Sequence, residues 1–295
     1  MKLLAYAACL VGIFAATSGG PAVAASTKRS PAACANDFFQ PLPPRPASAL
    51  TGSAFVQDIL RLGGPDRDAA VAAQLLTGNV PDFLRRLIPV TLSLTQSDGE
   101  KVDVTICVTP DYLAVGRDND FVRVPMGLPA AARIATQLGF MLPTTKMVDT
   151  IYDQAQVQLA PSPMPPTSQM ASTDYFWRHN RTVEKQRGRT GHSLTALIAG
   201  QKKDIVLSNR LRSKPGRVAI YGWHRQNGKP IQPLSTVHGK NYADYSHGVR
   251  LVSTTAFVNG KPKSLAEILQ DPRLSRIVSS EGPIPQPDRL LNSFR

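Results

Sequence analysis

VTLSLTQSDGEKVDVTICV, residues 90–108, is the stretch that decides the fold of this chain. Apolar residues alternate with polar ones over 90–94 and again over 102–108, the pattern of strands with one buried face. Asp98-Gly99 lies between the two runs and supplies the positive φ that a tight turn needs. The stretch therefore predicts an antiparallel β-hairpin.

Helical patterns surround this hairpin. Residues 66–76 end just before Gly78, and residues 128–138 have the apolar spacing of a helix and end at Gly139. A further helix is expected over 143–155. Residues 51–160 are thus predicted to form a helical scaffold that contains one hairpin.

The second half of the chain has a different pattern. Residues 161–172 are rich in proline and predict a linker, which either separates domains or crosses the surface of one domain. Beyond it, 173–295 is predicted to be a basic, histidine-containing α+β region whose last dozen residues are loosely held. Helices are expected at 175–186 and 193–199, and strands at 205–207, 218–223 and 249–258. The predicted fold class is α+β, with a helix-rich N-terminal half followed by a mixed, mainly antiparallel C-terminal sheet region.

The N-terminus has the pattern of a secretory signal. Lys2 precedes an apolar run over 3–17, and Ala22-Val23-Ala24 provides small residues for cleavage. The run is shorter than the roughly 20 residues that a spanning helix needs. We therefore expect a signal peptide over 1–24, a Pro/Ala-rich arm over 25–50, export to the periplasm or outside the cell, and no transmembrane segment in the mature chain.

Two cysteines remain after removal of the signal, Cys34 and Cys107. An even pair in an oxidising compartment favours a disulfide that ties the N-terminal arm to the body. Two buried free thiols are the alternative.

The positive charge of the chain is concentrated in residues 175–250. This segment holds 15 Lys and Arg against 3 Asp and Glu, and it contains all five histidines. A field of that sign attracts polyanions, such as peptidoglycan, other envelope glycans or nucleic acid. The segment also holds tyrosines and tryptophans able to stack on sugars or bases. We expect the functional surface here, with a solvated basic face as the alternative.

Residues 221–248 form the densest candidate site. His224, His238, His247 and Asp244 are the residue types of a catalytic zinc site, which uses three protein ligands and one open position. A metal-free version has a histidine as general base, Asp244 to orient it, and Ser246 or Ser235 as nucleophile. The third reading is that each histidine has a structural role.

Other residues in and near this site are expected to hold the substrate. The cations would attract it and the aromatic rings would stack against it; these residues are Trp223, Tyr242, Tyr245, Lys202, Lys203, Arg225 and Arg250. The sequence contains no His-Glu-x-x-His, Cys-x-x-Cys, phosphate-binding glycine loop or Asp-rich calcium loop. The favoured function is an exported hydrolase of an anionic envelope polymer, peptidoglycan first. A secreted phosphodiesterase or nuclease and a non-enzymatic basic envelope-binding protein are the alternatives.

Overall fold

The predicted hairpin is confirmed in the computed structural model, which describes Cys34 and residues 42–295. β1 (Ile88–Thr95) pairs with β2 (Lys101–Val108) in antiparallel register, and Leu92 lies opposite Val104 on the buried face. The predicted signal peptide and nearly all of the arm before residue 42 lie outside the described residues.

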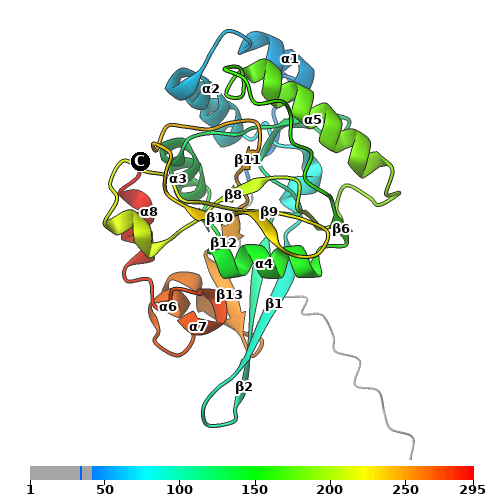
Figure 1. The fold of residues 1–295 in the computed structure, drawn as a ribbon. Coiled ribbons are helices and arrows are strands. Elements are labelled where there is room, and N and C mark those ends of the chain that lie inside the picture. Colours follow the sequence, from blue (N-terminus) through cyan, green and yellow to red (C-terminus); the bar gives the residue numbers. More distant parts are fainter. Residues whose placement is uncertain (1–33, 35–41) are drawn as a thin grey trace, which may run out of the picture. The chain divides into compact units, whose positions relative to one another are not determined.

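β2 is the centre of the larger sheet. β1 pairs with one edge, and the other edge pairs in turn with β13 (Thr255–Val258) and β12 (Val252–Ser253). Two outer strands complete the sheet: β14 (Lys261–Ser264) beside β13, and β5 (Phe140–Met141) beside β12. Strands from before and after the Pro-rich segment therefore share one sheet (Figure 1).

A second, four-stranded sheet carries four of the candidate residues, namely Lys203, Trp223, His224 and His247. Its order is β10 (Pro230–Ser235), β9 (Ile220–His224), β8 (Lys203–Ile205) and β11 (His247–Gly248). β11 runs parallel to β8, whereas the other neighbours are antiparallel. Two small strand pairs complete the β-structure: β3 (Ala114–Arg117) with β4 (Asp120–Arg123), and β6 (Val157–Gln158) with β7 (Ile198–Ala199).

The helices are concentrated in the first half of the described chain. Those before residue 190 are α1 (Gly52–Asp58), α2 (Gly64–Leu76), α3 (Leu128–Gln137), α4 (Thr145–Gln154) and α5 (Thr173–Gly188). The later helices are shorter: α6 (Leu265–Gln270), α7 (Ser275–Val278) and α8 (Pro287–Asn292). Two 3-10 turns lie at Asp82–Arg85 and Asn209–Arg212. α4 packs on both β1 and β9, so it joins the two sheets (Figure 1). The predicted α+β class is confirmed.

Two local predictions were wrong. Residues 193–199 form no helix, because Ile198–Ala199 pairs as β7 with β6. An apolar run this short fits a helix or a strand equally well, and tertiary pairing decides between them. The last dozen residues are also held firmly: α8 begins at Pro287, and Leu290 and Leu291 are buried in the main core.

The predicted disulfide is present and joins Cys34 to Cys107 in β2, which is consistent with an exported protein. It packs with Phe257 of β13 and so ties Cys34 to the central sheet. Within the part of the chain that the structure describes, no helix combines the length and the apolar character needed to cross a membrane.

Candidate functional site

The four residues predicted to share one site fall into two groups. His238, Asp244 and His247 lie together on the loop and short strand of residues 236–248, while His224, at the end of β9, contacts different partners. We call the first group, together with Tyr242 and Ser246, the Asp244 cluster. His224 with Asp149, Tyr221 and Asp204 is called the His224 group.

Asp244 organises the first group. One of its carboxylate oxygens, Oδ1, accepts hydrogen bonds from the backbone N and the Oγ of Ser246, at 2.8 and 2.5 Å. The other, Oδ2, accepts the Tyr242 hydroxyl at 3.3 Å and lies 3.9 Å from His247 Nε2. Ser246, His247 and Asp244 are all nearly inaccessible to solvent. The loop thus turns back on a single buried carboxylate.

Two rings close the solvent side of this cluster. His238 stacks on Tyr242 with 4.3 Å between ring centroids, and both are half-buried. The Tyr242 ring meets His247 edge-on at 5.8 Å. His238 and Tyr242 are therefore the members of the cluster that a ligand in solution is able to contact.

The protonation of the pair follows from its burial. Burial lowers the pKa of His247 to about 4, although Asp244 acts in the opposite direction. Burial disfavours ionised Asp244 as well, but His247 and the bonds from Ser246 bring its pKa below the ordinary value. At neutral pH the cluster holds an ionised carboxylate beside a neutral imidazole, and neither ring nitrogen of His247 has a hydrogen-bond partner among the described residues.

Lys202 is the buried cation beside the cluster. Its Nζ donates to the backbone oxygen of Tyr245 at 2.6 Å. Burial and the charge of Arg123 lower its pKa to about 7, while Asp244 and Asp111 partly oppose that change. Lys202 is thus close to half-protonated at neutral pH, the condition suited to proton transfer.

α5 and the Pro-rich segment cover this region. His179 of α5 is fully buried, its ring lies 5.0 Å from the Tyr245 ring, and burial with the charge of Lys202 lowers its pKa to about 2. The Tyr245 hydroxyl bonds to the backbone of Met164, within residues 161–172. The segment predicted as a linker therefore lies over the candidate site.

The His224 group is built on α4 and β9. His224 Nε2 lies 2.8 Å from Asp149 Oδ1, which also accepts the Tyr221 hydroxyl at 2.8 Å. The Tyr152 ring stacks on His224 at 4.6 Å. Asp149 is 43% exposed, so this group reaches solvent through its carboxylate.

A strained turn of backbone positions His224. Gly222 has φ 107° and Trp223 has φ 58°, a region that a tryptophan rarely adopts. A side chain at Gly222 would come within 3.5 Å of His224 Cε1 and 3.6 Å of Asp204 Oδ2. These are ordinary contact distances, so it is the positive φ of Gly222 that favours glycine at this position. Burial raises the pKa of the nearby Asp204 to about 6. Such strain is typical of functional sites.

The residues predicted to bind substrate differ in accessibility. Lys202, Arg250, Trp223 and Tyr245 are buried; Lys203 and Tyr242 are half-buried; Arg225 is exposed. The Arg250 guanidinium donates to the backbone oxygens of Thr109 and Ile198, and Lys203 Nζ lies 5.1 Å from the Trp223 ring centre. Their predicted role in substrate binding stays a prediction.

A zinc site and a serine-hydrolase site would each require a different arrangement of the predicted residues. A metal site needs several ligands in one place, and residues 42–295 with Cys34 contain no group of three His, Cys, Asp or Glu placed to hold a metal ion. In a serine hydrolase the histidine lies between the serine and the carboxylate. Here the carboxylate of Asp244 lies between Ser246 and His247.

Sequence reasoning missed the partners contributed by the first half of the chain. Asp149 binds His224, and Asp111 forms a buried pair with Arg123 at 2.5 Å, both of whose charges act on the pKa of Lys202. Tyr112 donates to Asp204 at 2.8 Å. Asp111 lies three residues after the end of β2, and an acid just beyond a buried strand is the signal that could have indicated it.

No protein-family model matches this sequence, and the searches found no significantly similar curated protein or solved structure.

Proposed function

We propose that this chain is an exported hydrolase of an anionic cell-envelope polymer, with the Asp244 cluster and Lys202 as its acid/base set. The single observation that carries the proposal is the buried assembly of ionised Asp244, neutral His247 and Lys202, whose pKa is about 7. Buried polar groups are ordinarily hydrogen-bonded, and an unpaired imidazole beside perturbed groups is typical of a catalytic site.

Each group has a definite part in this proposal. Lys202, near half-protonation, accepts a proton from water or substrate and returns it to the leaving group. Asp244 stays ionised and orients His247 through the 3.9 Å contact. His238 and Tyr242, at the solvent side, contact the substrate. Hydrolysis consumes one water molecule for each bond broken.

Peptidoglycan is the first substrate to test, because an exported protein meets it in the envelope and its stem peptides carry carboxylates. The mature chain would be incubated with insoluble peptidoglycan, and the soluble fragments would be identified by mass spectrometry. Asp244→Asn and Lys202→Met should each lower the release of fragments at least about 100-fold, the usual contribution of general acid/base catalysis.

The matched control is His192→Gln, because His192 is exposed and lies outside the cluster. It should leave turnover unchanged. Thermal unfolding would show that each variant is folded. Full turnover in folded Asp244→Asn and Lys202→Met would contradict the proposed machinery.

A non-enzymatic role is the second candidate, and the burial of the cluster favours it: Asp244, Ser246 and His247 are each at most 2% exposed. The chain would then bind an anionic polymer through its exposed cations. A protein that sediments with envelopes, is released by salt, and digests neither peptidoglycan nor nucleic acid would support this role. Digestion of nucleic acid, with binding that weakens steeply as salt rises, would instead support a phosphodiesterase.

A further inference from the structure

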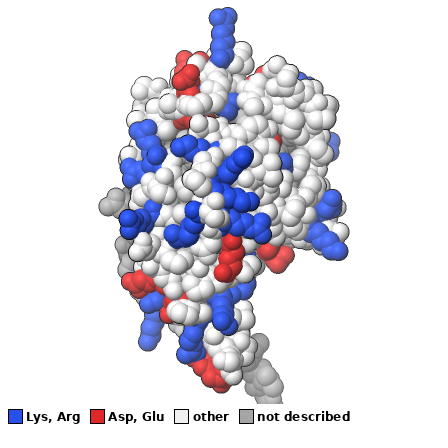
Figure 2. All heavy atoms as spheres, turned by 60° about the vertical axis from the view of Figure 1, so that its left-hand side comes forward, with Lys and Arg blue, Asp and Glu red and all other residues white. Residues whose placement is uncertain are grey.

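A basic pocket is lined by none of the residues of the two candidate groups. It has a volume of about 520 Å³ and is formed by four segments that are distant in sequence. These are Leu128 at the start of α3, the end of the second 3-10 turn with the loop after it, Lys240, and the C-terminal segment with α8. Figure 2 shows that many Lys and Arg side chains cluster on one face of the molecule, the face seen when the left-hand side of Figure 1 is turned forward.

Positive charge dominates the rim of this pocket. Arg212, Arg217, Lys240 and Arg289 line it, and no Asp or Glu does. None of the four belongs to an ion pair among the described residues. Four like charges around one cavity repel one another, and an anion in the cavity would relieve that repulsion.

The three guanidinium groups are held in place but keep most of their donors. Arg217 donates to the backbone oxygen of Val237 at 2.6 Å and Arg289 donates to Gln286 Oε1 at 3.5 Å. Arg212 donates to the backbone oxygen of Pro285 and to Asn209 Oδ1 at 3.3 Å. Each guanidinium has five N–H donors, so most stay free for a ligand. A positioned fork of donors loses less entropy on binding than a free side chain.

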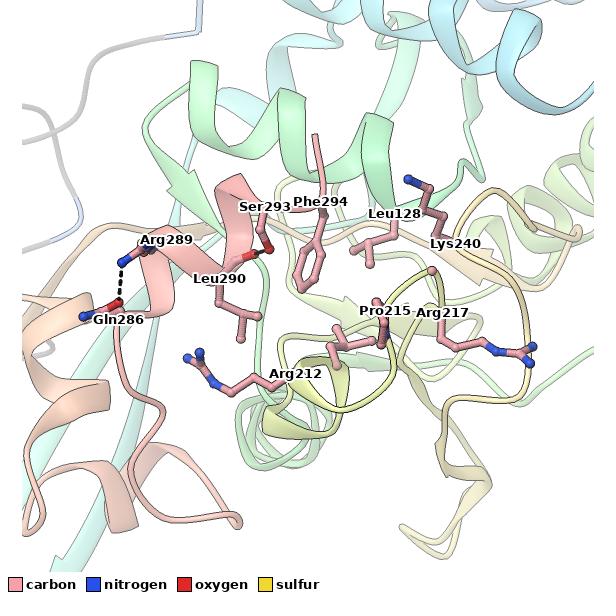
Figure 3. A pocket seen from close by; sticks show the side chains of 12 residues that line it. Leu128, Arg212, Pro215, Arg217, Lys240, Gln286, Arg289, Leu290, Ser293 and Phe294 are labelled. Carbon is pink, nitrogen blue, oxygen red and sulfur yellow. Dashed lines mark hydrogen bonds between the residues drawn. The ribbon is translucent and has the colours of Figure 1, made fainter.

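The floor of the pocket is apolar. Leu128, Leu290, Pro215 and the Phe294 ring lie between Arg212 and Arg289 on one side and Lys240 and Arg217 on the other (Figure 3). A bare inorganic anion would leave this floor exposed to water. A ligand with an anionic head and a planar or apolar body would fill both parts, and the volume lies within the range of small-molecule sites.

We propose that this pocket binds an organic phosphate, with its phosphate held by Arg212 and Arg289 and its organic body placed on Phe294. Phosphate is favoured over carboxylate because it carries up to two charges and three acceptor oxygens, which match the two guanidinium groups of Arg212 and Arg289 at once. The site is independent of the proposed hydrolase activity. A ligand bound in this pocket would lie between α8 and the loop of Lys240, and that loop continues into the Asp244 cluster.

Phenyl phosphate is a suitable probe, because it has both the dianionic head and a planar ring. Its binding to the mature chain would be measured by isothermal titration calorimetry, beside inorganic phosphate and benzoate. The proposal expects saturable one-to-one binding of phenyl phosphate, with inorganic phosphate weaker and benzoate weakest.

Variants assign the binding to the pocket. Arg289→Gln, on an exposed side chain, should weaken phenyl phosphate about tenfold, the expected cost of one charge-assisted contact. Phe294→Ala should weaken phenyl phosphate but not inorganic phosphate. Lys229→Gln removes an exposed cation outside the pocket and should change nothing.

Three results would overturn the proposal: no saturable binding of phenyl phosphate up to about 10 mM, benzoate bound as tightly as phenyl phosphate, or folded Arg289→Gln that binds like the wild type. Because calorimetry measures binding without turnover, loss of peptidoglycan hydrolysis would not affect this test.

Discussion

Replacing Lys202 with methionine should stabilise this protein at neutral pH and flatten its dependence on pH. Lys202 is fully buried, and burial with the charge of Arg123 lowers its pKa from 10.5 to about 7. Between these two values the unfolded chain binds more protons at this lysine than the folded chain does. Stability therefore rises with pH across this window, and the full cost of the buried charge is present below about pH 7.

The size of the effect follows from the change in pKa. A shift from 10.5 to about 7 corresponds to roughly 5 kcal/mol against the protonated folded state. Between pH 7 and pH 9 the free energy of unfolding of the wild type should rise by about 2 kcal/mol of this amount. Methionine removes the donor that lies 2.6 Å from the Tyr245 oxygen, which costs about 1–3 kcal/mol. The net stabilisation at pH 7 should be about 2–3 kcal/mol.

Urea unfolding at pH 7 and pH 9 would measure these free energies for the wild type and Lys202→Met. Lys229→Met is the control, because Lys229 is exposed on the turn between β9 and β10. Wild type and control should gain about 2 kcal/mol more between the two pH values than Lys202→Met does. An equal gain in all three proteins would refute the reasoning. So would a Lys202→Met protein less stable than the wild type at pH 7, since Asp244 and Asp111 would then offset the buried charge.

Three further predictions concern packing and local electrostatics. Gly248→Ala should lower the free energy of unfolding in urea by about 1–3 kcal/mol, because its Cβ would lie 2.5 Å from the Tyr112 ring; the matched Gly239→Ala, with nothing within 4 Å, should cost less. Asp149→Asn should move the Tyr221 titration to lower pH in ultraviolet absorbance, because burial and the Asp149 carboxylate together raise the pKa of that hydroxyl; an unchanged titration would contradict the contact. Reduction of the Cys34–Cys107 disulfide, which spans 73 residues, should destabilise by about 3–5 kcal/mol and lower the melting temperature, with Cys34→Ala/Cys107→Ala unaffected by reductant.

The parts of the fold that sequence predicted are those decided locally. The hairpin at 88–108 forms because alternation and the Asp98-Gly99 turn specify it without help from distant residues. α3 and α5 likewise follow local periodicity. Residues 193–199 were mistaken for a helix because their pairing partner, β6, lies about 40 residues earlier in the chain. Pairing at that distance leaves no local trace in sequence.

The candidate site was predicted only in part for a related reason. Asp244 and His247 are three residues apart, so a single turn of chain brings them together, and their neighbourhood could be read from spacing. His224 precedes them by about 20 residues, which made a shared site plausible. Asp149 on α4 is its actual partner, and only the packing of α4 on β9 creates that contact.

Counting charges in the sequence has a limit, which buried cations of residues 175–250 and the exposed Arg289 illustrate. A count from the sequence includes every Lys and Arg as surface charge, yet Lys202 and Arg250 are buried and present no charged group at the protein surface. Arg289, outside the predicted functional segment, lines the basic pocket because α8 packs beside α3. The field that attracts an anion is set by which cations stay exposed after folding, and that depends on contacts between distant segments. A search for the ligand should therefore begin from the pocket rather than from the block of charge in the sequence.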